Sequence, residues 1–153
     1  MDSSEGVLMG IMAGFGIFTL LIIALCIFIY VILSLALMKI AQKKGIENAW
    51  LAWIPIGNSY IIGKIAGPFH FITDIAKPEL VLPIMSLCGF IPVVGWLIVL
   101  AGSILTYAAY YTIFKEYRGE KATTMIILTI IFSFIALPIY FHSIAKELDQ
   151  QTY

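Results

Sequence analysis

The charged residues of this chain are confined to short segments, and long uncharged runs separate them. The uncharged runs cover residues 6–38, 48–63, 65–73, 80–114 and 122–145. Of the 153 residues, 61% are hydrophobic and 12% are charged. An average soluble domain is roughly 45–50% apolar and about 25% charged. A soluble chain of this length could not bury so much apolar surface, so the sequence predicts an integral membrane protein.

The lengths of the runs predict an all-α fold, a single membrane domain over residues 1–153 that forms a bundle of four hydrophobic helices. A spanning helix needs about 20 apolar residues to cross roughly 30 Å of hydrocarbon. The predicted spans are 12–36, 49–69, 93–114 and 123–143. Because run 80–114 is too long for one straight crossing, residues 80–90 are interpreted as an apolar lead-in to the third span.

Proline and glycine interrupt the second and third predicted helices, and a weaker copy of the pattern occurs in the fourth. Proline removes a backbone hydrogen bond and disfavours helical geometry in the residue before it. Two explanations of this recurrence are equally open: chance, and a repeated helix-break unit of the kind found in transporters. The residues at these candidate breaks are Pro55, Gly57, Asn58, Pro92, Gly95 and Pro138.

Two arrangements are open for the second segment. Residues 49–69 either cross the membrane or return to the same side as a re-entrant loop around Pro55–Asn58. The acidic N-terminus is expected to lie outside, with the basic segment after the first span inside. In either arrangement six Lys or Arg residues lie on one side and three on the other, so the charge bias does not decide. Both arrangements put Glu120 and the C-terminus on opposite sides.

One motif resembles a known group of proteins. It runs Trp50-Leu51-Ala52-Trp53-Ile54-Pro55-Ile56-Gly57-Asn58, and Lys64-Ile65-Ala66-Gly67 follows it. Over about residues 40–142 the chain resembles small, uncharacterised bacterial multi-spanning membrane proteins with a Trp-x-Ala-x-Ile-Pro-x-x-Asn motif. The resemblance implies residence in the bacterial cytoplasmic membrane and brings no established activity. The chain departs from the group at the second turn, where Gly95 stands in place of a frequent Asn.

Residues that carry chemistry are scattered. None of the long uncharged runs contains Asp or Glu, which acid–base catalysis and proton relays usually require. Ser59 and Lys64 are the only local Ser/Lys pair, and no polar stretch is long enough to build a catalytic domain around them. Because His70, His142 and the two cysteines are isolated, we predict no enzyme activity and no catalytic, cofactor or metal site. No basic tail points to nucleic acid.

Several polar side chains in the apolar runs have two interpretations. The Asn58 amide either satisfies carbonyl groups freed by the break at Pro55, which we favour, or contacts a ligand or ion. Ser86, Ser103 and Thr106 either line an aqueous path or, as we favour, donate to carbonyl groups of their own helix. Glycine pairs with four-residue spacing favour close helix packing, within the chain or between two copies. These pairs are Gly10 with Gly14 and Gly63 with Gly67.

These features predict a non-enzymatic accessory or interaction protein of the cell membrane. Its expected partners are the lipid bilayer and either another membrane protein or a second copy of the chain. The alternative is an oligomeric small channel or transporter. That alternative depends on the breaks around Pro55–Asn58 and Pro92–Gly95 meeting in the middle of the membrane.

Overall fold

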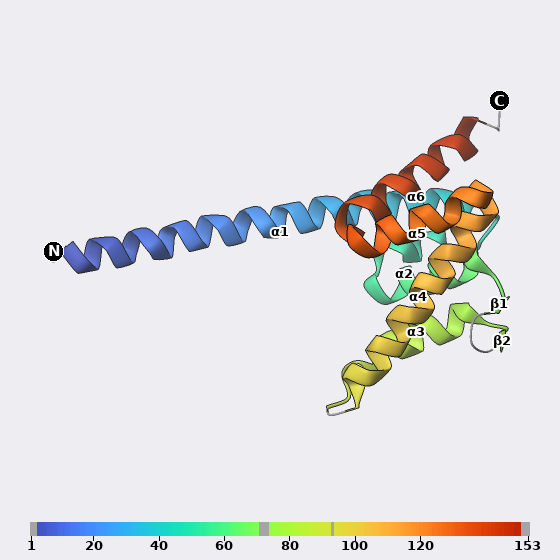
Figure 1. The fold of residues 1–153 in the computed structure, drawn as a ribbon, viewed down its shortest axis with the longest axis horizontal. Helices are drawn as coiled ribbons and strands as arrows, with labels where there is room; N and C mark the ends of the chain where they lie inside the picture. The colour runs from blue at the N-terminus through green and yellow to red at the C-terminus, as the bar shows by residue number, and fades with distance from the viewer. Residues whose placement is uncertain (1–2, 71–73, 93, 151–153) are drawn as a thin grey trace.

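The computed structural model describes residues 3–70, 74–92 and 94–150, and the described chain is almost entirely helical (Figure 1). The helices are α1 (Ser3–Lys43), the 3-10 turn η1 (Ala49–Trp53), α2 (Pro55–Ala66), α3 (Pro78–Cys88), α4 (Gly95–Arg118), the 3-10 turn η2 (Gly119–Lys121), α5 (Ala122–Ile131) and α6 (Ser133–Gln150). Two short strands, β1 (Phe69–His70) and β2 (Asp74–Ile75), pair antiparallel between α2 and α3. The predicted all-α class is confirmed.

Helix α1 is continuous over 41 residues, but only its C-terminal part packs against the rest of the chain (Figure 1). The side chains of residues 4–28 are exposed, and most of them are large and apolar. From Ser34 to Ala41 one side of the helix is buried. The mean hydropathy is high on every side of the exposed part, which is typical of a helix surrounded by lipid.

A Schellman motif ends α1. Gly45 adopts φ +67°, in the left-handed region that glycine enters without a steric penalty. The Ile46 N–H donates to the Ala41 carbonyl oxygen at 2.9 Å, and the Gly45 N–H donates to that of Gln42 at 3.0 Å. The chain therefore turns back along α1 directly after its basic end.

The rest of the chain folds back on itself in helical hairpins (Figure 1). α3 and α4 lie side by side, and the chain turns between them at residues 89–92 and 94. Glycine is needed at this turn, because a Cβ on Gly95 would lie 2.6 Å from the Gly89 carbonyl oxygen. α5 and α6 meet at Phe132, which has φ −122° and ψ 43° and interrupts the helix.

The core lies where the C-terminal part of α1 meets α2, α4 and α6. Its largest fully buried side chains include Phe114, Phe141 and Leu37. The rings of Phe114 and Phe141 have centroids 5.8 Å apart, and Tyr110 contacts Phe141 edge-on at 5.6 Å. Edge-on aromatic pairs of this kind hold neighbouring helices at a defined angle.

Two of the four predicted spans fall in helices that are long and apolar enough to cross a membrane. These helical stretches are Ser4–Lys43, within α1, and Gly95–Ile131, which comprises α4, η2 and α5, and they contain most of spans 12–36 and 93–114. The lead-in predicted over 80–90 corresponds to α3. The predicted bundle of four membrane helices is not confirmed.

The other two predicted spans are interrupted. Over 49–69, Ile54 is extended (ψ 128°) because it precedes Pro55, and α2 is only 12 residues long, roughly 18 Å. Over 123–143 the helix breaks at Phe132. Pro138, which belongs to the weaker copy of the Pro/Gly pattern, lies inside α6, where it removes only the hydrogen bond to the carbonyl of Phe134 near the helix start.

Candidate functional site

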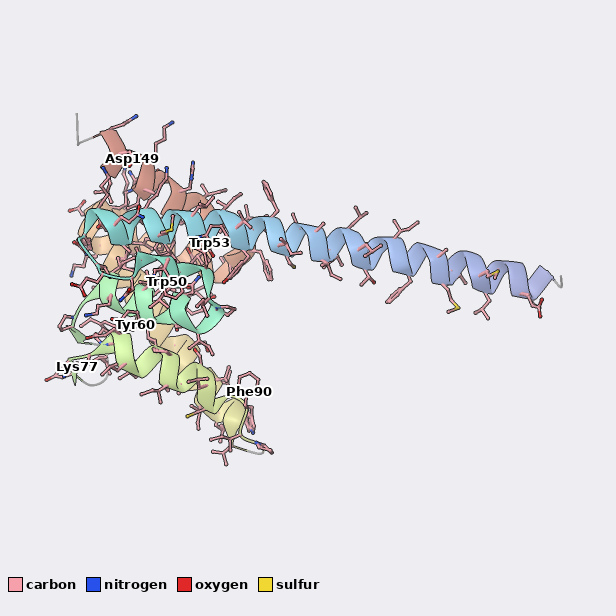
Figure 2. All side chains as sticks on the ribbon, turned by 180° about the vertical axis from the view of Figure 1, so that it is seen from behind. Trp50, Trp53, Tyr60, Lys77, Phe90 and Asp149 are labelled. Carbon is pink, nitrogen blue, oxygen red and sulfur yellow. The ribbon has the colours of Figure 1, made fainter. Side chains whose placement is uncertain are left out.

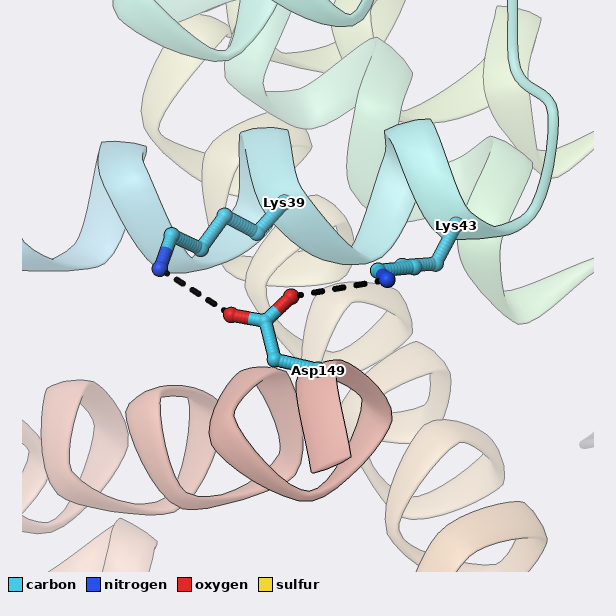
Figure 3. Close-up of polar contacts among 3 residues, drawn as sticks. All are labelled: Lys39, Lys43 and Asp149. Atoms are coloured by element: carbon cyan, nitrogen blue, oxygen red, sulfur yellow. Dashed lines mark hydrogen bonds and ion pairs between the residues drawn. The ribbon is translucent and has the colours of Figure 1, made fainter. Parts of the chain in front are cut away.

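Ion pairs join the C-terminal ends of α1, α4 and α6. Asp149 on α6 lies 3.2 Å from Lys39 Nζ and 3.6 Å from Lys43 Nζ, so one carboxylate bridges two turns of α1 (Figure 3). The charged C-terminal residues of these three helices therefore lie together at one end of the molecule, which we call the charged end. The other pairs are Lys44 with Glu116 at 2.7 Å and Arg118 with Glu147 at 2.7 Å.

These contacts contradict both predicted arrangements of the chain. Arg118 precedes Glu120 by two residues, and Glu147 precedes the C-terminus by six. Groups 2.7 Å apart cannot lie on opposite sides of a hydrocarbon layer about 30 Å thick. Glu120 and the end of α6 thus lie on the same side of any membrane that the chain crosses. Sequence reasoning failed here because it counted run 122–145 as a crossing, whereas α5 and α6 form a hairpin.

The Asp149 carboxylate is held in its charged form. The hydrogen bond from Lys39, together with the positive charges of Lys39 and Lys43, lowers the pKa of Asp149 below its ordinary value, although desolvation opposes this shift. The group is solvent-exposed, so the contribution of the pair to stability is modest. Its main effect is to fix the register of α6 against α1.

A groove of about 680 Å³, the α1–α6 groove, runs between α1 and α6 next to this charged end. Its floor is apolar and includes Phe28, Ile32, Ile135 and Ile139. Because Lys39 and Asp149 pair near the C-terminal ends of both helices, α1 and α6 run parallel along the groove. The far end of the groove reaches Leu25 on α1.

Cationic and polar side chains line the groove at the charged end. They are Lys39 from α1 and His142, Ser143 and Lys146 from α6. His142 and Lys146 are exposed and lie four residues apart, on the same face of α6 as Ile135 and Ile139. This arrangement can hold a long apolar group with an anionic head.

The predicted site around Asn58 has a structural role in the described structure. Asn58 is buried, and its amide nitrogen donates to the Ala52 carbonyl oxygen at 3.4 Å, across the break between η1 and α2. Pro55 occupies the first turn of α2, where its missing N–H needs no partner. A Cβ on Gly57 would collide with the Leu51 carbonyl oxygen, so η1 and α2 can pack closely only with glycine here.

The breaks proposed to meet in the membrane do not meet. Figure 2 shows Phe90, at the α3–α4 turn that contains Pro92, well away from Trp50 and Trp53 on η1. Phe90 is 84% exposed, so this turn is the tip of a projecting hairpin. Pro138, in contrast, lines the α1–α6 groove.

The two glycine pairs differ in what surrounds them. A Cβ on Gly63 would lie 2.5 Å from the Glu79 backbone nitrogen, so this glycine packs directly against the start of α3. Gly67 has φ +65° and ends α2 without a close neighbour. Gly10 and Gly14 have no neighbour within 4 Å, so internal packing does not explain this pair.

Hydroxyl side chains cluster around a second cavity of about 350 Å³ between α3, α4 and the start of α6. Ser86, Ser103 and Thr106 donate to carbonyl groups of their own helices at 2.8–3.0 Å, as the sequence favoured. Tyr107 and Ser133 share a hydrogen bond of 2.7 Å across the cavity wall. These hydroxyl groups are occupied by the protein itself.

The sequence missed Lys39 and Lys146 as parts of a site. The four-residue spacing of His142 and Lys146, in line with the apolar face of α6, was a usable signal. No sequence signal pairs α6 with α1. Among residues 3–70, 74–92 and 94–150, no three His, Cys, Asp or Glu side chains gather in a way that could hold a metal ion.

Comparison of the chain with protein families, curated proteins and solved structures finds no match.

Proposed function

We propose that this chain is a non-enzymatic interaction protein of the cell membrane, anchored by α1, with a helical body that enters the membrane from one side. Its activity is binding, through the α1–α6 groove and the uncovered part of α1. The observation that carries the proposal is the separation of charge from apolar surface: ion-paired helix ends at one end, and exposed apolar helices projecting from it.

The exposure of the apolar helices supports membrane insertion. Only 17% of the most hydropathic window of α1, and 28% of that of the Gly95–Ile131 helix, is buried. Core helices of soluble proteins are mostly buried, and continuous apolar surface on this scale is a membrane or protein contact. Helix α1, with 41 residues and a length of roughly 62 Å, is long enough to cross roughly 30 Å of hydrocarbon with Leu25 near the midplane.

The distribution of basic residues supports an orientation. All nine Lys and Arg residues follow residue 38, whereas Asp2 and Glu5 precede the apolar part of α1. With one crossing and the body on one side, nine basic residues lie on that side and none on the other. The positive-inside rule therefore favours a cytoplasmic body and an outer N-terminus. This bias is stronger than the six against three of the multi-crossing arrangements.

The short helices are consistent with a body that dips into the membrane without crossing it. α2, α3 and α5 have 12, 11 and 10 residues, or roughly 15–18 Å each. Hairpins that enter and return need protein cover for their backbone groups. The contacts of α2 with α3, of α3 with α4 and of α5 with α6 provide that cover.

A second candidate function is a small channel or transporter, favoured by the hydroxyl-lined cavity beside Tyr107 and Ser133. Flux measurements separate the two candidates. The interaction protein, reconstituted in phosphatidylcholine vesicles, floats with the vesicles and conducts no ions or small solutes above empty vesicles. A flux that Ser133→Val removes while the variant still floats would replace the first candidate with the second.

A further inference from the structure

The α1–α6 groove matches one leaflet of a bilayer in length. Fourteen residues separate Leu25 from Lys39, the two ends of the groove on α1. At 1.5 Å per residue this is roughly 21 Å. A bilayer including its headgroups is about 40–45 Å thick, so half of it, one leaflet, is about 20–22 Å. The cationic end of the groove thus lies at the headgroup level when its apolar end lies near the midplane.

Among the residues that the structure describes, the cationic end of the groove carries a lysine outside the ion pairs. Asp149 lies within ion-pair distance of both Lys39 and Lys43. Glu147 is paired with Arg118. In the part of the chain that the structure describes, Lys146 takes part in no ion pair. An anionic group is therefore attracted to this end of the groove.

The apolar floor has room for acyl chains. Phe28, Ile135 and Ile139 are more than half exposed although they line a groove of about 680 Å³. These side chains offer van der Waals contacts to acyl chains along the groove. Basic pockets between membrane helices on the cytoplasmic side are recurrent binding sites for anionic lipid headgroups.

We propose that the α1–α6 groove binds one anionic glycerophospholipid of the inner leaflet. Its phosphate lies against Lys146, His142 and Lys39, and its acyl chains lie along Ile32 and Ile135. A zwitterionic lipid fits the same floor but brings its own positive charge to the lysines. The inference rests on the proposed insertion of α1 with the charged end inside.

Native mass spectrometry of the full chain in mild detergent tests the site, with phosphatidylglycerol, phosphatidylcholine and inorganic phosphate as probes. We expect phosphatidylglycerol to bind at least fivefold more tightly than phosphatidylcholine, and phosphate alone not to bind. Lys146→Gln weakens phosphatidylglycerol about fivefold, the usual attraction of one lysine to anionic lipid. The matched control is Lys77→Gln, which removes the same charge from an exposed position before α3, far from Asp149 in Figure 2. It changes binding less than twofold.

A second pair of variants tests the apolar floor. Ile135→Trp fills the groove from an exposed position and reduces binding of both lipids, whereas Ile131→Trp, equally exposed but outside the groove, leaves binding unchanged. Equal affinity for the two lipids, or equal loss in Lys146→Gln and Lys77→Gln, overturns the inference. Vesicle flotation is measured in parallel. If the protein floats with the vesicles but shows no preference between the two lipids, only the inference is refuted. If the protein does not float, the proposed function is refuted as well.

Discussion

Replacing Gly63 by alanine tests the closest helix contact in the body. Gly63 on α2 faces the backbone at the start of α3, and an added Cβ would lie 2.5 Å from the Glu79 nitrogen and 2.6 Å from the Pro78 carbonyl carbon. Ordinary contacts of a Cβ begin near 3.4 Å. The start of α3 must therefore move by nearly 1 Å, and it cannot adjust by a side-chain rotation because the obstructing atoms belong to the backbone.

Overpacking of this kind costs about 1–3 kcal/mol of unfolding free energy. Because the shift would also disturb the buried Leu82, we expect about 2 kcal/mol for Gly63→Ala, or a decrease of about 4–8 °C in Tm for a chain of this size. Tm is measured by thermal shift in detergent. Gly10→Ala is the control, since nothing lies within 4 Å of Gly10 and alanine favours helix. If Gly63→Ala lowers Tm no more than Gly10→Ala does, the assigned α2–α3 contact is incorrect.

Three further predictions concern polar groups. The Ser34 hydroxyl is buried and has no hydrogen-bond partner among the described residues, so Ser34→Ala is expected to raise the stability by about 1 kcal/mol in the same assay; a loss would reveal a partner. Because Lys39 lowers the pKa of Asp149, the carboxylate stabilises the fold above its ordinary pKa of 3.8, and this contribution is lost as the pH falls through the lowered value. The Tm deficit of Asp149→Asn should therefore be present at pH 7 and shrink at pH values below 3.8; a deficit that grows on acidification contradicts the ion pair. Asn58→Ala should lower the free energy of unfolding by about 1 kcal/mol, because the amide donates to the Ala52 carbonyl across the η1–α2 break, and should leave lipid binding unchanged.

The helices that run without interruption could be predicted from hydropathy alone. Run 6–38 contains neither charge nor proline, so α1 was predictable, and Gly45 after two lysines indicated its end. The turn around Pro92 was predictable for the same local reason, because a proline and flanking glycines disfavour helix there. Both features depend only on neighbouring residues.

The hairpin of α5 and α6 could not be predicted. No proline or glycine occurs near Phe132, and the proline that does occur, Pro138, is tolerated inside α6. The break is set by tertiary contacts, such as the hydrogen bond between Tyr107 and Ser133. Hydropathy therefore counted residues 123–143 as one continuous span, whereas the structure divides them between α5 and α6.

The α1–α6 groove escaped prediction because it depends on two helices a hundred residues apart in the chain. Lys39 ends the apolar run of α1 and Lys146 follows that of α6, and each alone is typical of a residue at a membrane interface. The packing of α1 against α6, through buried side chains such as Leu37 and Phe141, brings them to one groove. The glycine pair at Gly10 and Gly14 shows the opposite case, a pattern visible in the sequence that has no contact within the chain.

The sidedness of three positions tests the central claim, a single crossing with the whole charged end on one side. Single cysteines at Glu5, Glu120 and Gln150, in a chain with Cys26→Ser and Cys88→Ser, are labelled with a membrane-impermeant maleimide in intact cells and in inverted vesicles. The account predicts that Glu120→Cys and Gln150→Cys label only in inverted vesicles, and Glu5→Cys only in intact cells. Labelling of Glu120→Cys and Gln150→Cys from opposite sides would contradict it.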